Sequence, residues 1–221
     1  MKITPKFLSG QSISKRLRAF VMLVTMLVVT GCYMPIRFDA EIDISRGGYY
    51  EFFFDGYLAK VELYQGLKDG EINREEELAQ AEIIRQDFTR DSATKEFEYF
   101  KQGHFKVNYQ RDGDLLKTKT MTFFRRNEYI LGISYNFETG MISMLGKSLK
   151  RDIKERLRAS GLDSSGELRI FTDGLVTSHN ATTVKPFPSK GNGYKLYTWK
   201  IQNLLHPTPA LKIKVHEVSN N

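Results

Sequence analysis

Cys32 is the residue whose surroundings most clearly specify a chemical reaction. Lys15, Arg16 and Arg18 precede an apolar run that ends in Val-Thr-Gly-Cys. A basic end, an apolar stretch and a small residue before a cysteine together indicate a bacterial lipoprotein signal with its lipobox. The pattern predicts that diacylglycerol is attached to the Cys32 thiol and that a peptidase removes residues 1–31. Cys32 is therefore the predicted lipidation site.

The same apolar segment allows a second interpretation, a membrane-spanning helix. Residues 19–36 contain no charged side chain, and these 18 residues reach the lower limit for crossing a bilayer. Gly31 and Pro35 interrupt the run, however, and the only cysteine of the chain falls at the expected cleavage point. We therefore favour lipidation and expect a protein that is lipid-anchored in the cell envelope. Because Tyr33 and not aspartate follows the cysteine, the outer membrane is favoured if the host has two membranes.

Histidines are the next candidates for chemistry, as metal ligands or as acid-base catalysts. The four histidines are His104, His179, His206 and His216, and their spacing matches no metal-binding motif. Asp173 precedes His179 in the same segment, so this pair could meet across a turn and serve an envelope hydrolase. No Gly-x-Ser-x-Gly sequence supplies a nucleophile for it. We predict no metal site, no cofactor and no catalytic activity, and we keep the hydrolase as the alternative function.

A third group of residues could act through charge. Residues 148–160 place Leu149, Ile153 and Leu157 on one face of a predicted helix. At about 100° per residue, five basic side chains form a stripe beside that face: Lys147, Lys150, Arg151, Lys154 and Arg158. On a chain anchored at Cys32, this basic stripe could contact anionic lipid headgroups. An ordinary solvated helix face is the simpler alternative.

The net charge of the chain comes mostly from the predicted signal. The 221 residues carry a net charge of +7, and five positive charges without an acidic residue lie within residues 1–31. Removal of this segment leaves +2, so the composition gives little support for nucleic-acid binding. The single cysteine excludes an intrachain disulfide. The mature chain must therefore be stabilised by packing.

Residues 36–221 are expected to form a single α+β domain, joined to the lipid by a short tether at residues 32–35. Apolar residues alternate with charged ones from Ile36 to Ile44, as in a half-buried strand. Residues 49–54 are the expected hairpin partner, after a turn at Arg46-Gly47-Gly48. The odd-even pattern predicts that Ile36, Phe38, Ala40, Ile42 and Ile44 share one buried face.

Helices and strands occupy separate blocks of the chain, which favours an α+β fold over repeated βαβ units. Asn73 and Glu76 have the spacing of a capping box at a helix start. The expected fold is a largely antiparallel sheet with about three helices, at residues 57–67, 73–91 and 148–160. Residues 97–146 are expected to form an antiparallel meander, with a turn at residues 111–113. Later strands are expected at residues 168–172, 175–177, 194–201 and 210–215.

Three segments resemble those of a bacterial lipoprotein family. The lipobox is followed at once by Arg-Phe-Asp-Ala-Glu-Ile-Asp-Ile at residues 37–44. Leu-Val-Thr-Ser-His-Asn-Ala-Thr-Thr-Val follows at residues 175–184, and Tyr-Thr-Trp-Lys-Ile at residues 197–201. Together these segments resemble the LppM-like bacterial lipoproteins. The resemblance implies an α+β domain and an envelope lipoprotein without established catalytic residues, so it transfers no site to this chain.

The sequence as a whole predicts an envelope lipoprotein with a non-catalytic binding or structural role. The expected partners are membrane lipid through Cys32, anionic headgroups at the basic stripe, or another envelope protein, and no nucleic acid. Aromatic residues such as Tyr49, Tyr50 and Phe52 to Phe54 are expected to fill the core or, alternatively, to line an apolar groove for an acyl chain.

Overall fold

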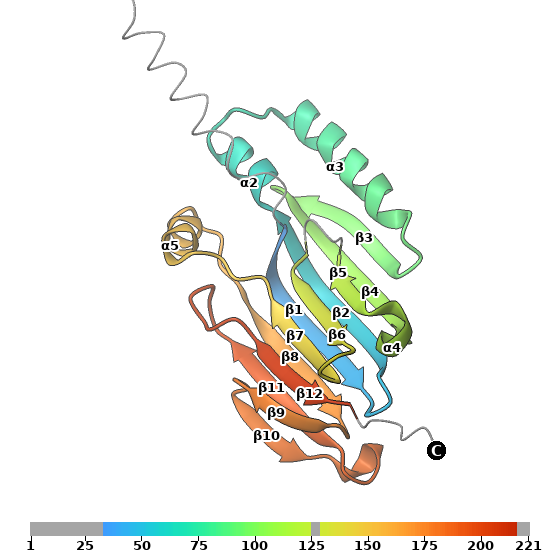
Figure 1. Cartoon of the computed structure of the whole chain (residues 1–221). Coiled ribbons are helices and arrows are strands. Elements are labelled where there is room, and N and C mark those ends of the chain that lie inside the picture. The colour runs from blue at the N-terminus through green and yellow to red at the C-terminus, as the bar shows by residue number, and fades with distance from the viewer. Residues whose placement is uncertain (1–32, 125–128, 216–221) are drawn as a thin grey trace, which may run out of the picture.

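The computed structural model describes residues 33–124 and 129–215, and these form two β-sheets with helices around them (Figure 1). The larger sheet has seven strands, in the order β10 (Thr183–Pro186), β11 (Lys195–Ile201), β8 (Ser165–Thr172), β1 (Tyr33–Ile44), β2 (Tyr49–Lys60), β4 (His104–Asp114) and β3 (Thr94–Lys101). The smaller sheet has five strands, in the order β5 (Thr120–Phe123), β6 (Leu131–Asn136), β7 (Met141–Gly146), β12 (Ala210–Lys214) and β9 (Leu175–His179).

The mixed α+β class agrees with the sequence prediction, but the strands form two sheets instead of one. The predicted meander is divided, because β3 and β4 join the larger sheet whereas β5, β6 and β7 build the smaller one. Neighbouring strands in the described residues are antiparallel with one exception, the parallel pair of β1 and β8. This pair brings the late strand β8 directly beside the first strand of the chain.

Four α-helices lie in the described residues: α2 (Val61–Lys68), α3 (Arg74–Thr89), α4 (Leu115–Thr118) and α5 (Arg151–Ala159), and a 3-10 turn, η2 (Pro188–Lys190), precedes β11. The prediction for α3 is confirmed with its capping box. The Asn73 side chain accepts hydrogen bonds from the N–H groups of Glu75 and Glu76, and the Asn73 N–H donates to the Glu76 carboxylate at 3.0 Å. The helix α4 and the strand β10 were not predicted.

Two segments predicted as helix or turn belong to strands, because their backbones pair with neighbours. Residues 57–60 extend β2 and pair with β1, so the predicted helix begins only at Val61. Residues 111–113, predicted as a turn, continue β4 and pair with residues 50–52 of β2. In both segments, cross-strand pairing overrides the local signals of helix spacing and of an Asp-Gly sequence.

The first strand starts earlier than predicted. Residues 33–35, expected as part of a tether, pair with residues 58–60 and are the start of β1. A register shift follows between Pro35 and Arg37. Ala40, Ile42 and Ile44 are buried as predicted, with Phe38 packed against them. Ile36 is only half-buried and lies in a separate cluster around Met34 and Leu157, so the prediction of one shared face is wrong for this residue.

The two sheets share a core that is filled with aromatic rings on the side of α3. The ring of Phe124, directly after β5, lies 4.3 Å from the Phe88 ring of α3. Phe88 of α3 stacks on Phe97 of β3 with ring centroids 4.3 Å apart. Thus α3 covers the β3 end of the larger sheet, beside the smaller sheet, and closes that side of the core.

Candidate functional site

An apolar cavity of about 440 Å³ lies at the other side of the core, at the end of the sheets where β1 begins and where β7 and β11 end. This volume falls within the range of small-molecule sites, roughly 300–1,000 Å³. The strands supply most of its walls: Phe38, Ala40, Phe52, Phe54 and Leu168 from the larger sheet, and Phe123, Leu131 and Gly146 from the smaller sheet.

The space exists because a small side chain lies between large ones. Ala40 on β1 is paired with Phe54 on β2 and with Leu168 on β8, and all three line the cavity. The Phe54 ring also stacks on the Phe38 ring, with centroids 5.9 Å apart. These contacts hold the rings as walls, so they do not fill the gap above Ala40. Part of the predicted aromatic set therefore does line an apolar space.

The helix α5 and the segment between β11 and β12 border the mouth of the cavity. Leu149, Ile153 and Leu157 line it from the side of α5, as the predicted apolar face requires. Residues 203–204 and 206–209 line it from the other side. Figure 1 shows α5 and α3 on opposite sides of the sheets, so the cavity and the aromatic core are bordered by different helices.

The charged residues that line the cavity are basic, and within the described part of the chain no Asp or Glu is among them. They are Lys147, Lys154 and Arg156. On a helix with 3.6 residues per turn, Arg156 and Lys154 lie about 60° to one side and about 100° to the other side of Ile153. The apolar face of α5 is therefore flanked by positive charge at the mouth.

These basic groups differ in their partners. The Lys154 ammonium donates to the main-chain oxygen of His206 at 3.5 Å, and no carboxylate pairs with it in the described residues. Arg156 forms an exposed ion pair with Asp152 at 3.4 Å. The sequence prediction missed Arg156 because it counted the basic residues on one side of the apolar face only.

The structure divides the predicted basic stripe into two groups. Lys147 and Lys154 line the cavity, whereas Lys150, Arg151 and Arg158 are exposed and do not line it. The helix starts at Arg151, so Lys147 does not belong to it, and the expected continuous stripe is wrong in that respect. The backbone at Lys147 still follows the sheet, because its N–H donates to the carbonyl oxygen of residue 130 at 2.8 Å.

Two members of the exposed group are held in ion pairs. Arg151 pairs with Glu155 at 2.8 Å and Arg158 pairs with Asp163 at 3.0 Å. Such exposed pairs contribute little to stability, but they reduce the free positive charge of this surface. Contact of Lys150, Arg151 and Arg158 with a membrane stays a prediction.

The predicted lipidation site adjoins the cavity in the sequence. Tyr33, Met34 and Pro35 line the cavity, and the Tyr33 ring lies 4.7 Å from the Lys60 ammonium. Cys32 itself lies outside the described residues, as does the predicted signal. In the sequence, Cys32 directly precedes Tyr33, a residue of the cavity wall.

The structure does not bring the proposed hydrolase pair together. Asp173 precedes β9 and His179 ends it, and a strand of this length spans about 13 Å. Burial raises the pKa of Asp173, but two hydrogen bonds from Arg46, at 2.6 and 2.7 Å, outweigh it and the pKa is lowered. His179 Nδ1 accepts from the Ala181 N–H at 3.2 Å, and its ring contacts Tyr197. The geometry therefore gives no support to a shared acid-base role.

The other histidines are placed apart from one another. His104 Nδ1 lies 2.9 Å from the main-chain oxygen of Gln102, and His206 lies at the mouth of the cavity. His216 lies outside the described residues. In residues 33–124 and 129–215, no three His, Cys, Asp or Glu side chains gather as a metal would require. The absence of a metal site in the whole chain stays a prediction from the sequence.

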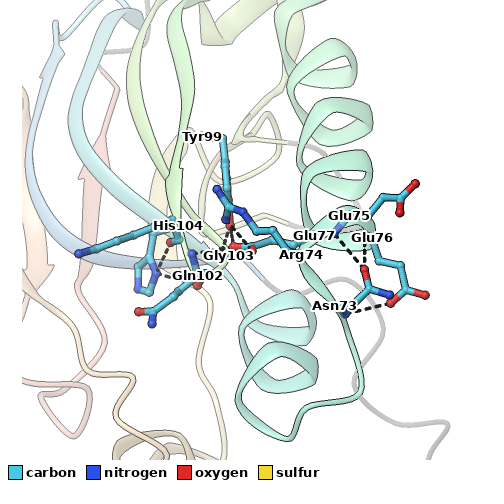
Figure 2. A network of polar contacts seen from close by, with 10 residues as sticks. Asn73, Arg74, Glu75, Glu76, Glu77, Tyr99, Gln102, Gly103 and His104 are labelled. Atoms are coloured by element: carbon cyan, nitrogen blue, oxygen red, sulfur yellow. Dashed lines mark hydrogen bonds and ion pairs between the residues drawn. The ribbon is translucent and has the colours of Figure 1, made fainter.

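A buried carboxylate that sequence reasoning missed connects α3 to the β3–β4 turn. Glu77 is 5% exposed, and Figure 2 shows its carboxylate among Arg74, Tyr99 and Gln102. It accepts from the Tyr99 hydroxyl, from Arg74 at 2.7 Å and from the Gln102 N–H at 3.1 Å. Burial alone would raise the pKa of Glu77, but these hydrogen bonds lower it. Burial, together with Glu77, raises the pKa of Tyr99 to about 12, so its hydroxyl stays a donor.

Comparison with known proteins gives a weak likeness in fold and no family assignment. No model of a protein family matches the chain, and no curated protein matches its sequence. Among solved structures, the chain is similar to the folded domain of Mycobacterium tuberculosis LppM, determined by NMR, with a TM-score of 0.43 and 12% identity. The match covers 85% of this chain and 94% of the LppM domain. Among the described residues, no helix has the length and apolarity needed to span a membrane.

Proposed function

We propose that the protein is a lipid-anchored lipoprotein of the bacterial envelope that binds an acyl chain in its apolar cavity, without catalysing a reaction. The position of the cavity is the observation that supports this function. It lies at the end of the sheets where β1 begins, and Tyr33, the residue after the predicted lipidation site, is part of its wall. The predicted anchor is therefore joined directly to a residue of the cavity wall.

The energetics of transfer suit exchange with a membrane. Each methylene that leaves water for an apolar site contributes about 0.8 kcal/mol, so ten buried methylenes give a gross gain of roughly 8 kcal/mol, from which the cost of ordering the chain is subtracted. Movement from the bilayer into the cavity exchanges one apolar environment for another and is nearly neutral. A domain held at the bilayer surface can therefore take up and release lipid, whereas loss of that lipid to water is strongly disfavoured.

The exposed basic residues Lys150, Arg151 and Arg158 would contribute to the same orientation. Each basic group near an anionic surface is worth about 1 kcal/mol, and the ion pairs of Arg151 and Arg158 reduce that contribution. Location at the outer membrane, in a host with two membranes, follows from Tyr33 at the position after the predicted lipidation site.

The binding function is tested by measuring the lipid that the protein holds without a covalent bond. The full chain is purified from bacterial membranes and extracted with organic solvent, which leaves the lipid on Cys32 attached. We expect about one extracted acyl chain per protein, measured by mass spectrometry. Ala40→Leu, which adds three carbon atoms between Phe54 and Leu168 and so narrows the cavity, should remove most of it. The matched control, Ala159→Leu on the exposed side of α5, should not. Wild-type protein that carries no extractable lipid would disprove the binding function.

Anchoring is tested separately by Cys32→Ser. This variant should lose metabolic labelling with a palmitate analogue and should accumulate as an uncleaved precursor, seen as a larger band on gels. Persistent labelling would show that the lipobox interpretation is wrong.

A further inference from the structure

The size of the cavity limits how much lipid it can hold. If each water-sized group takes about 30 Å³, then 440 Å³ accommodates roughly 15 such groups. This is the size of one long acyl chain. The two chains of a phospholipid require about twice that volume, so the second chain would remain outside.

The side chains at the mouth also favour a ligand with a negatively charged headgroup. Lys147, Lys154 and Arg156 line the cavity together with apolar side chains, and no acidic residue of the described chain does so. A neutral headgroup, such as that of a fatty alcohol, can accept a hydrogen bond there but forms no ion pair. An anionic headgroup forms charge-assisted hydrogen bonds there.

Lys154 is the basic residue best placed for that contact. It is half-buried, and its ammonium has a single described partner, the His206 main-chain oxygen at the long distance of 3.5 Å. A lysine ammonium has three donor hydrogens, so it can accept a ligand and keep this bond. Arg156, in contrast, already shares its charge with Asp152.

We infer that the cavity is a site for a long-chain fatty acid, with its single acyl chain between the sheets and its carboxylate at the mouth against Lys154. This inference rests on the proposed binding of an acyl chain and specifies the ligand class. It assigns Lys154 to headgroup recognition. It gives no such role to Lys150, the N-cap residue of α5, which is exposed and does not line the cavity.

Photolabelling of the full chain in bacterial membranes tests the ligand class. The probe is palmitate with a diazirine near the end of its chain, and adducts are mapped by peptide mass spectrometry. We expect adducts in peptides from the wall between the sheets, such as the one with Phe54, because a carboxylate at the mouth leaves the end of the chain there. Unlabelled palmitate should compete with the probe at a concentration at least tenfold lower than hexadecanol, which has the same chain and no charge.

Three variants test the role of Lys154. Lys154→Met keeps a chain of similar length, and it should weaken competition by palmitate about tenfold, the effect of losing one charge-assisted hydrogen bond. Competition by hexadecanol should change much less. Lys154→Arg should retain the preference for palmitate. Lys150→Met, the matched control at the N-cap position of the same helix, should behave as wild type. Competition by hexadecanol requires an intact cavity. A misfolded variant is therefore recognised because neither palmitate nor hexadecanol competes with the probe.

The contrary outcomes are distinct. Equal competition by palmitate and hexadecanol in the wild type would overturn the fatty-acid assignment and leave the acyl-chain site in place. Competition by phosphatidylglycerol but not by palmitate would replace the fatty acid with a phospholipid. Equal effects of Lys150→Met and Lys154→Met would show that Lys154 acts only through the general positive charge of the surface. The assignment of Lys154 to headgroup recognition would then be wrong. No adduct in any cavity peptide would contradict both the inference and the proposed function.

Discussion

The helices α3 and α5 border opposite sides of the space between the sheets, and this space is filled beside α3 but hollow beside α5. On the side of α3, Phe88 is 3% exposed and packs on Phe97, and the space is filled. On the side of α5, Leu157 is the only buried residue of the helix, and a cavity remains. The same two sheets therefore contain one region built for stability and one with room for a ligand.

The N-termini of the two helices also differ, because α3 is capped and α5 is not. A full capping box opens α3, whereas the N-cap residue of α5, Lys150, makes no side-chain hydrogen bond to the helix. Burial and capping both stabilise a helix, so α5 is the element held more weakly. Weakly held elements are those that open first, and here that element borders the cavity mouth.

Truncation of one side chain on each side should give the largest change in the free energy of unfolding and so tests this contrast first. Phe88→Ala should lower the free energy of unfolding by about 3–5 kcal/mol, because it leaves a void among packed rings. Ile153→Ala removes a half-buried side chain beside an existing cavity, and about 1 kcal/mol is expected. Pulse proteolysis of the full chain in urea measures both. Similar losses for the two variants would remove the distinction between the filled side and the hollow side.

The Glu77 network adds a pH dependence to the α3 side. The pKa of Glu77 is lowered in the folded chain from its ordinary 4.5, so its stabilisation is present above that value and is lost as the pH falls through the folded pKa. Glu77→Gln should cost about 1–3 kcal/mol at neutral pH. Its unfolding free energy should also change less than that of wild type between about pH 5 and 3. Parallel pH profiles for the two proteins would contradict this assignment.

Removal of the α3 cap should have a smaller effect. Asn73→Ala deletes the side chain that accepts from two N–H groups of the first turn. A loss of about 1 kcal/mol is expected, with faster hydrogen exchange in that turn. Asn73→Asp retains the acceptor and should restore the wild-type value, whereas equal losses in both variants would argue against a capping role.

A new cap on α5 should give the smallest effect, in the opposite direction. Lys150 has extended backbone angles, φ −62° and ψ 150°, which suit an N-cap residue. Lys150→Ser should therefore slow hydrogen exchange in α5 and stabilise it by about 0.5 kcal/mol. Lys150→Ala, with the same loss of charge and no acceptor, is the control. If both variants slowed exchange equally, removal of charge and not capping would be the cause.

Local signals in the sequence predicted the elements whose stability is local. The Asn73–Glu76 spacing located α3 correctly, and the alternation from Phe38 to Ile44 located most of the buried face of β1. The division into two sheets was not predictable in this way, because it depends on β8 pairing with β1 and β9 pairing with β12. Sequence periodicity contains no information on the partner of a strand.

For the candidate site, the sequence predicted the apolar face of α5 and the possibility of an apolar space lined by aromatic residues. It did not predict which of the five basic residues line the cavity, because Lys147 continues the sheet and is not helical. Residues 203–209 were missed for another reason. The Pro207-Thr-Pro209 sequence indicates a turn, but the turn lies just before it, where the His206 N–H donates to the Asn203 carbonyl oxygen at 3.0 Å. Only the tertiary structure shows that this segment borders a cavity.

The pairing of β1 with β8 determines when folding can finish. Arg169 of β8 binds Glu41 of β1 across 128 residues of sequence, and contacts between such distant residues form slowly. Before β8 is available, β1 pairs with β2 and presents an open edge, which invites pairing with other chains. Without β8, the uncovered edge of β1 would therefore make the first four strands prone to aggregation. A chain shortened before residue 165 should accumulate as aggregate, however well its N-terminal hairpin folds.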